Sequence, residues 1–141
     1  MMKRILNYTF KNLTLLKEAL CHSSAKKPGS PSNERLEFLG DSVLGIVMSE
    51  LLYKRFPHKE EGELTVIKSE LVSGSILTDL AREVKLEERI EVGGGIKKMP
   101  ESILANSLEA VFGAIYLDGG LKPIRAIIRY LFERKINEVQ I

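Results

Sequence analysis

Apolar residues recur at helical spacing along almost the whole chain, and short polar or glycine-rich segments separate the helical runs. Residues 26–32 hold two prolines and a glycine, and residues 93–95 are three consecutive glycines, which is typical of loops and turns. Apart from a short extended piece near residues 90–92, the pattern predicts helices and no β-sheet. The expected fold class is therefore all-α. The predicted helices cover residues 13–20, 33–56, 64–71, 76–84, 102–117 and 123–139.

The length of the chain, 141 residues, suits one hydrophobic core and is short for two. Hydrophobic residues make up 44% and charged residues 28%, which excludes a disordered or collagen-like chain. No apolar run approaches the roughly 18 residues of a membrane span, and the chain does not begin with an apolar stretch of signal-peptide length. We therefore expect a single cytoplasmic domain with no membrane partner.

The formal net charge is only +2, but the charges are unevenly distributed. Residues 1–30 carry six Lys or Arg against one Glu, and residues 121–141 carry five against two acids, so the middle is acidic. This arrangement suits a protein that binds a polyanion and keeps carboxylates for metal ions, although solvated helix faces would give it too. Because Cys21 is the only cysteine and there are two histidines, any metal would be held mainly by oxygen.

Acidic side chains lie inside the two most apolar helical runs. Glu37 and Asp41 are four residues apart, and Asn106 and Glu109 are three apart, so each pair shares one helical face. Buried carboxylates are costly unless a cation or hydrogen bonds compensate them, and Mg²⁺ prefers such oxygen ligands. One pair alone is more typical of a polar stripe. Two pairs in the two most apolar helices favour a metal site where those helices face each other.

Residues 33–44, with the sequence Asn-Glu-Arg-Leu-Glu-Phe-Leu-Gly-Asp-Ser-Val-Leu, resemble the signature segment of the ribonuclease III family. Further segments resemble the family in the right order, namely residues 19–24, 61–65, 71–72, 103–110 and 113–120. The resemblance covers nearly the whole chain. It implies an all-α endonuclease domain of a bacterial-type enzyme over residues 1–141, without the double-stranded-RNA-binding domain that most bacterial members carry. We expect a truncated chain rather than a naturally short member.

The resemblance also implies roles for individual residues. Glu37, Asp41 and Glu109 match the catalytic acids that bind Mg²⁺, for which Mn²⁺ could substitute. Asn106 stands where many members have Asp, which implies a neutral fourth metal ligand and one negative charge fewer.

Three other residues match the family outside its acid centre. Glu34 and Glu61 match acids near the RNA groove, although each could be an ordinary surface charge. Phe38 matches an aromatic residue that packs into the partner subunit of a homodimer, although the pattern alone fits a core phenylalanine equally well.

The function implied is a Mg²⁺-dependent endoribonuclease that hydrolyses phosphodiester bonds of double-stranded RNA during RNA processing, including rRNA processing. The products would carry 5′-phosphate and 3′-hydroxyl ends, and the enzyme would act as a homodimer. Asn106 motivates an alternative, an RNA-binding or RNA-processing partner with the same fold and weakened catalysis. A helical interaction module unrelated to RNA is a third possibility, which the length of the signature disfavours.

Overall fold

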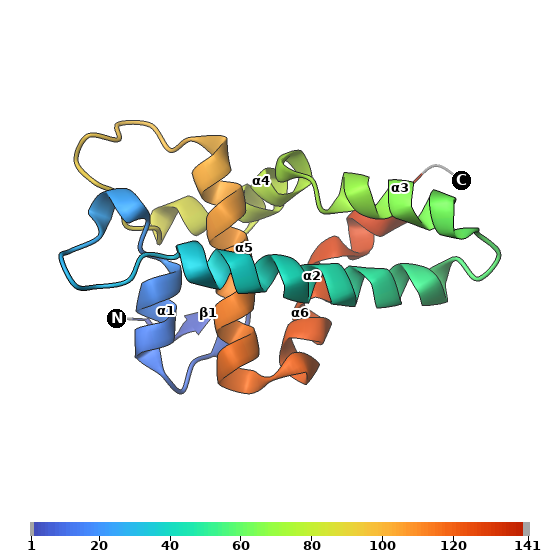
Figure 1. The fold of residues 1–141 in the computed structure, drawn as a ribbon, viewed down its shortest axis with the longest axis horizontal. Helices are drawn as coiled ribbons and strands as arrows, with labels where there is room; N and C mark the ends of the chain where they lie inside the picture. Colours follow the sequence, from blue (N-terminus) through green and yellow to red (C-terminus); the bar gives the residue numbers. More distant parts are fainter. Residues whose placement is uncertain (1, 140–141) are drawn as a thin grey trace.

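Helix α5, Glu101–Gly119, runs through the middle of the molecule, and helix α2, Glu34–Arg55, crosses it (Figure 1). The structure is a computed structural model and describes residues 2–139. Within that range the six predicted helices are confirmed to within a few residues, and the all-α fold class is confirmed. The other helices are α1 (Leu13–Ala19), α3 (Glu61–Leu71), α4 (Gly74–Glu83) and α6 (Leu121–Asn137), and two single 3₁₀ turns are η1 (Ser23–Ala25) and η2 (Leu86–Glu88).

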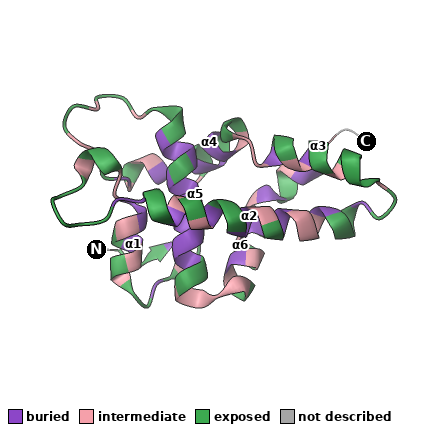
Figure 2. Ribbon diagram, viewed as in Figure 1, coloured by how far each residue is buried: buried purple, intermediate pink, exposed green. Residues whose placement is uncertain are grey.

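Helix α5 is the central element of the core. Residues 103–105 and 107–115 are all buried, so the middle of the helix is covered on every side, and Figure 2 shows this middle part in the buried colour and exposed turns toward the ends. A helix that is apolar all round is stable only inside a protein. Pro100 stands at its start and Gly120, with φ of 85°, at its end, where the Gly120 N–H donates to the Tyr116 carbonyl at 2.8 Å.

Helix α2 is buried on one face only. Residues such as Leu44, Val47 and Met48 pack into the core, because their spacing places them on the side that faces α5 and α6. Phe38 and Tyr53 are exposed. Although its sequence is densely apolar, α2 is therefore not buried most of the way round in the single chain. The second apolar face of α2 is open in the single chain.

The N-terminus forms a hairpin that the sequence did not predict. Strands β1, Arg4–Ile5, and β2, Tyr8–Thr9, pair antiparallel. Leu6 and Asn7 both have positive φ, 52° and 62°, as the two-residue turn of a hairpin requires. The expectation of no β-sheet was therefore wrong at this end, because strands of two residues are too short to show an alternating pattern.

Asp118 joins this N-terminal segment to the end of α5. Its carboxylate accepts the Tyr8 hydroxyl at 2.6 Å and the backbone N–H groups of Lys11 and Asn12 at 2.9 Å each. Burial raises the pKa of Asp118, but these hydrogen bonds and the Lys11 charge outweigh it and hold the pKa below its usual value.

None of the helices in the described part of the chain is both long and apolar enough to cross a membrane.

Candidate active site

Two glycines set the distance between α2 and α5 where the helices cross. A Cβ added to Gly40 would lie 1.7 Å from the carbonyl oxygen of Glu109, and one added to Gly113 would lie 2.4 Å from that of Leu36. No side chain larger than hydrogen fits at either position, so the two backbones are in direct contact. The acidic residues that each helix carries near the crossing are consequently neighbours.

Glu109 is the buried member of the acid group, with 8% of its surface exposed. Burial is the main reason that its pKa is raised to about 8, and a hydrogen bond to Asp41 and the charges of Asp41 and Glu37 add to the effect. Burial also raises the pKa of Glu37, together with the charges of Glu34 and Asp41. The structure therefore brings acids from both helices into one interacting group.

We call Glu37, Asp41 and Glu109 the acid cluster. Asp41 is exposed, Glu37 is half-buried and Glu109 is buried, so the group extends from the core to the surface. Among residues 2–139, no Lys, Arg or His forms an ion pair with any of the three. No ion pair from these described residues therefore compensates the negative charge of the cluster.

The donors of the acid cluster are of the type that Mg²⁺ prefers, since all are carboxylate oxygens. Nevertheless, no three His, Cys, Asp or Glu side chains in the described residues already form a group that could hold a metal ion. Carboxylates repel one another when no cation lies between them, and the proximity of Asp41 and Glu37 contributes to the raised pKa of Glu109. The three side chains would have to draw together around a metal ion.

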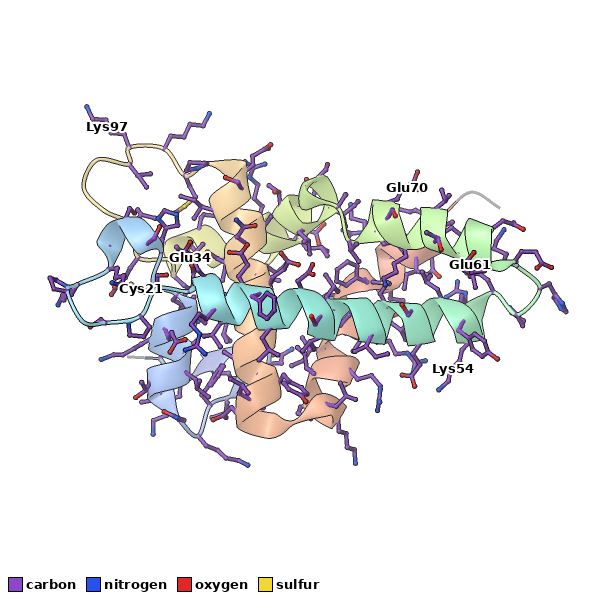
Figure 3. All side chains as sticks on the ribbon, viewed as in Figure 1. Cys21, Glu34, Lys54, Glu61, Glu70 and Lys97 are labelled. Carbon is purple, nitrogen blue, oxygen red and sulfur yellow. The ribbon has the colours of Figure 1, made fainter. Side chains whose placement is uncertain are left out.

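The remaining predicted site residues fall at different distances from the cluster. Asn106 is exposed on α5, three residues before Glu109. Glu34 lies in the first turn of α2, accepts a hydrogen bond from Ser32 Oγ at 3.1 Å, and acts on Glu37 through its charge. Figure 3 shows Glu61 at the start of α3, near the opposite end of α2 from Glu34. Within one chain, Glu61 is therefore not part of the acid site.

Phe38 lies on the open face of α2, with 79% of its surface exposed. Ile46 and Tyr53, which follow at 8 and 15 residues, are 60% and 74% exposed and share that side of the helix. Large apolar side chains gathered on one face are typical of a surface that binds another protein chain. The alternative that Phe38 is a core residue is excluded for the single chain.

Sequence reasoning missed a buried polar contact beside the acid cluster. The side-chain amide of Asn33 donates to Ser107 Oγ at 3.1 Å and to the Ala19 carbonyl at 3.3 Å. Asn33 is 2% and Ser107 0% exposed. No local pattern in the sequence signals this contact, because the two residues are 74 positions apart.

Comparisons with known proteins define the class of protein to which this fold belongs, the helical nuclease domains. The nuclease domain of ribonuclease III from Campylobacter jejuni superposes with a TM-score of 0.88 at 38% identity, covering 94% of each chain. A Dicer from Pichia stipitis superposes with a TM-score of 0.70 at 30% identity, over 90% of this chain and 57% of that one. Ribonuclease 3 of Shewanella baltica is 44% identical over 97% of this chain.

Residues 12–135 match the family described as ribonuclease-III-like, and the chain belongs to this family. Ribonuclease 3 of Buchnera aphidicola is 41% identical over 97% of the chain. The chain spans about three fifths, 61%, of the length of these curated relatives. The resemblance seen in residues 33–44 is thereby confirmed.

Proposed function

We propose that the chain is the catalytic domain of a Mg²⁺-dependent endonuclease that cleaves double-stranded RNA to 5′-phosphate and 3′-hydroxyl ends. The observation that carries the proposal is the acid cluster, three carboxyl groups that form no ion pair with any Lys, Arg or His of residues 2–139, one of which has its pKa raised to about 8. Uncompensated carboxylates at the junction of two helices are a typical binding site for a divalent cation. Family membership supplies the reaction class.

The acids have different tasks in this proposal. Glu109, held in the core, and Asp41, at the surface, would face the ion from the two helices, and Glu37 would add charge one turn before Asp41. Asn106, a neutral oxygen donor on the exposed side of α5, would be a fourth ligand or would hold a water. When bound, Mg²⁺ supplies a water of lowered pKa and positive charge that neutralises the scissile phosphate.

The raised pKa of Glu109 has a consequence for metal binding. A carboxyl with a pKa of about 8 keeps its proton at neutral pH, so binding of a cation would release that proton. Mg²⁺ affinity should consequently increase with pH up to about 8. Mn²⁺, which accepts the same oxygen ligands, should replace Mg²⁺.

The proposed partner is double-stranded RNA, bound by two copies of the chain. A-form RNA offers a shallow minor groove and regular phosphates, so recognition would depend on shape and charge rather than on base sequence. The open face of α2, with Phe38 exposed, is the proposed contact between the two copies. A groove along both copies would also place Glu34 and Glu61 near the RNA. The proposed substrate is an rRNA precursor, and the proposed location of the reaction is the cytoplasm.

The test is cleavage of an end-labelled RNA duplex by the purified chain with Mg²⁺, with and without EDTA. We expect metal-dependent cuts whose products accept ligation at 3′-hydroxyl and 5′-phosphate ends. Glu109→Gln should abolish cleavage, whereas Glu133→Gln, at an exposed position of α6, should not. Metal-independent cleavage, or cleavage by Glu109→Gln, would contradict the proposal.

Asn106 supports a second candidate, an RNA-binding partner with weakened catalysis. A neutral residue at this exposed position beside the cluster leaves three acids instead of four. Duplex RNA would then bind with strong salt dependence and would not be cut. Binding without cleavage in the same assay identifies this candidate.

A further inference from the structure

The packing of α2 against α5 is the most extensive between any two elements of the described chain, and two contacts in it are specific. The first is the close contact at Gly40 and Gly113, where the backbones touch. The second is the hydrogen bond from Asn33 Nδ2 to Ser107 Oγ at 3.1 Å. Asn33 is three residues before Leu36 and seven before Gly40, the two α2 residues of the backbone contact, which is about 5 to 10 Å along the helix at 1.5 Å per residue.

Apolar packing and the backbone contact already hold α2 against α5, but apolar contacts have no preferred direction. The hydrogen bond from Asn33 to Ser107 is directional, so it adds a restraint on how the two helices cross. Because Ser107 is on α5, the same bond restrains the rotation of that helix, and Glu109 follows Ser107 by two residues.

Asn33 is itself held firmly. Its backbone N–H donates to the Cys21 carbonyl at 2.8 Å, its carbonyl accepts the N–H of Glu37 at 2.9 Å, and its amide also donates to the Ala19 carbonyl. Asn33 therefore joins the end of α1, the start of α2 and the middle of α5. A buried amide with these partners has one arrangement, since any rotation would leave a buried polar group without a hydrogen bond.

We propose that Asn33, through Ser107, is a positioning residue that aligns the acids of α2 with Glu109 of α5. Asn33, Glu37 and Asp41 follow one another at four-residue spacing, so the two acids extend from Asn33 along one side of α2. Glu109 approaches from the helix that Ser107 fixes. This inference rests on the proposed function, since alignment matters only if the cluster holds a metal ion and acts on a phosphate.

The alternative is a purely structural role, and Thr78 provides the matched control. Thr78 is also buried, 3% exposed, and its hydroxyl donates to the Glu101 carbonyl at the start of the same helix at 3.2 Å. Thr78→Val removes this bond eight residues from Glu109 with little change in volume. Ser107→Ala and Thr78→Val should lower the unfolding temperature similarly, because each removes one side-chain hydrogen bond to α5, and Asn33→Ala should lower it further because it also removes the bond to the Ala19 carbonyl.

The experiment measures kcat and KM for an RNA duplex, and Mn²⁺ binding without RNA by electron paramagnetic resonance. Asn33→Ala should lower kcat by about tenfold or more with KM changed less than about threefold, because misaligned groups lose rate before they lose binding. Its Mn²⁺ affinity should fall at least about threefold, since the ligands no longer converge. Thr78→Val should keep the wild-type kcat, KM and Mn²⁺ affinity.

Ser107→Ala is the second variant, and it retains the backbone contacts of Asn33 if Asn33→Ala fails to fold. Ser107→Ala should reproduce the loss in kcat. The double variant should lose no more kcat than the single variant with the larger loss, because both substitutions remove the same hydrogen bond between Asn33 and Ser107. An active wild type with unchanged kcat in Ser107→Ala, or an equal loss in Thr78→Val, overturns this inference alone. A wild type that neither binds Mn²⁺ nor cuts RNA overturns the proposed function as well.

Discussion

The carbonyl oxygen of Glu109 lies 1.7 Å from the place that a Cβ of Gly40 would occupy. The backbones of α2 and α5 therefore touch at the residue that carries the buried acid. Any larger residue at position 40 would separate the helices and, with them, Glu109 from Glu37 and Asp41. The hydrogen bond and the charge interactions that raise the pKa of Glu109 depend on this contact.

Replacing Gly40 should accordingly destabilise the fold. Gly40→Ala inserts a methyl group into a backbone contact, and we expect a loss of roughly 2–4 kcal/mol in the free energy of unfolding. Gly45→Ala is the control on the same helix, where only the flexible Lys68 Nζ lies within 4 Å, at 3.7 Å. That change should stabilise the helix by about 0.5–1 kcal/mol. Urea unfolding measures both, and equal stability of the two variants would refute the close contact.

Glu109→Gln should stabilise the metal-free protein at alkaline pH. The pKa of Glu109 in the folded protein, about 8, lies above the usual 4.5. The contribution of this protonated carboxyl to the free energy of unfolding is therefore fully present below about pH 4.5 and is lost as pH rises through 8. Gln has no proton to lose, so the variant should be more stable by about 5 kcal/mol at pH 9 and equal at pH 4.5, since each pKa unit between the two values corresponds to about 1.4 kcal/mol. Thermal unfolding in EDTA measures this. Added Mg²⁺ should raise the stability of the wild type only, and a constant difference between pH 4.5 and 9 would contradict the burial of this charge.

The Tyr8–Asp118 contact predicts a different pH dependence. The pKa of Asp118 is lowered, so its contribution is present above the usual value of 3.8 and is lost as pH falls below it. Asp118→Asn should cost about 1–2 kcal/mol in the free energy of unfolding at pH 7 and almost nothing at pH 2.5.

At alkaline pH the same contact depends on the Tyr8 hydroxyl. The pKa of Tyr8 is raised to about 12, so the contact weakens as pH rises from 10 through 12. Urea midpoints across pH test both, and Tyr8→Phe should lack the alkaline change.

Phe38→Ala should shift the chain towards monomers. Phe38 is 79% exposed on the open face of α2, so the substitution removes apolar surface that a second copy would cover. A buried aromatic anchor typically contributes more than about 2 kcal/mol to such an interface. Tyr130→Ala, 75% exposed on α6, is the control and should leave the mass unchanged. Light scattering at micromolar concentration measures the mass, and a wild type with the mass of one chain would contradict the homodimer.

Asn106→Asp should lower the Mg²⁺ concentration needed for half-maximal cleavage. The substitution raises the number of acids around the site from three to four, which attracts a divalent cation more strongly. Repulsion among carboxylates without metal also grows, so the thermal stability of the metal-free variant should stay equal or fall. A Mg²⁺ titration of the cleavage rate compares the two proteins. An identical or higher requirement in the variant would mean that Asn106 does not face the metal.

The sequence by itself determined the helices and identified the acids. Helix formation depends on spacing within a few residues, so the apolar period fixed all six helices, and Glu109 was conspicuous as a charge in the most apolar one. The sequence did not predict the N-terminal hairpin, because strands of two residues show no alternating pattern. It also did not predict the exposed face of α2, because the same apolar pattern results whether a side chain packs into its own core or against another chain.

Only the tertiary structure decided how the acids meet. The distance between α2 and α5 depends on Gly40 against Glu109, and their alignment depends on Asn33 and Ser107, which are 74 residues apart. No local pattern encodes such pairs, because each contact exists only once both helices are packed. Burial then converts an ordinary glutamate into a carboxyl with a pKa of about 8, since the desolvation that shifts Glu109 is a property of the assembled core.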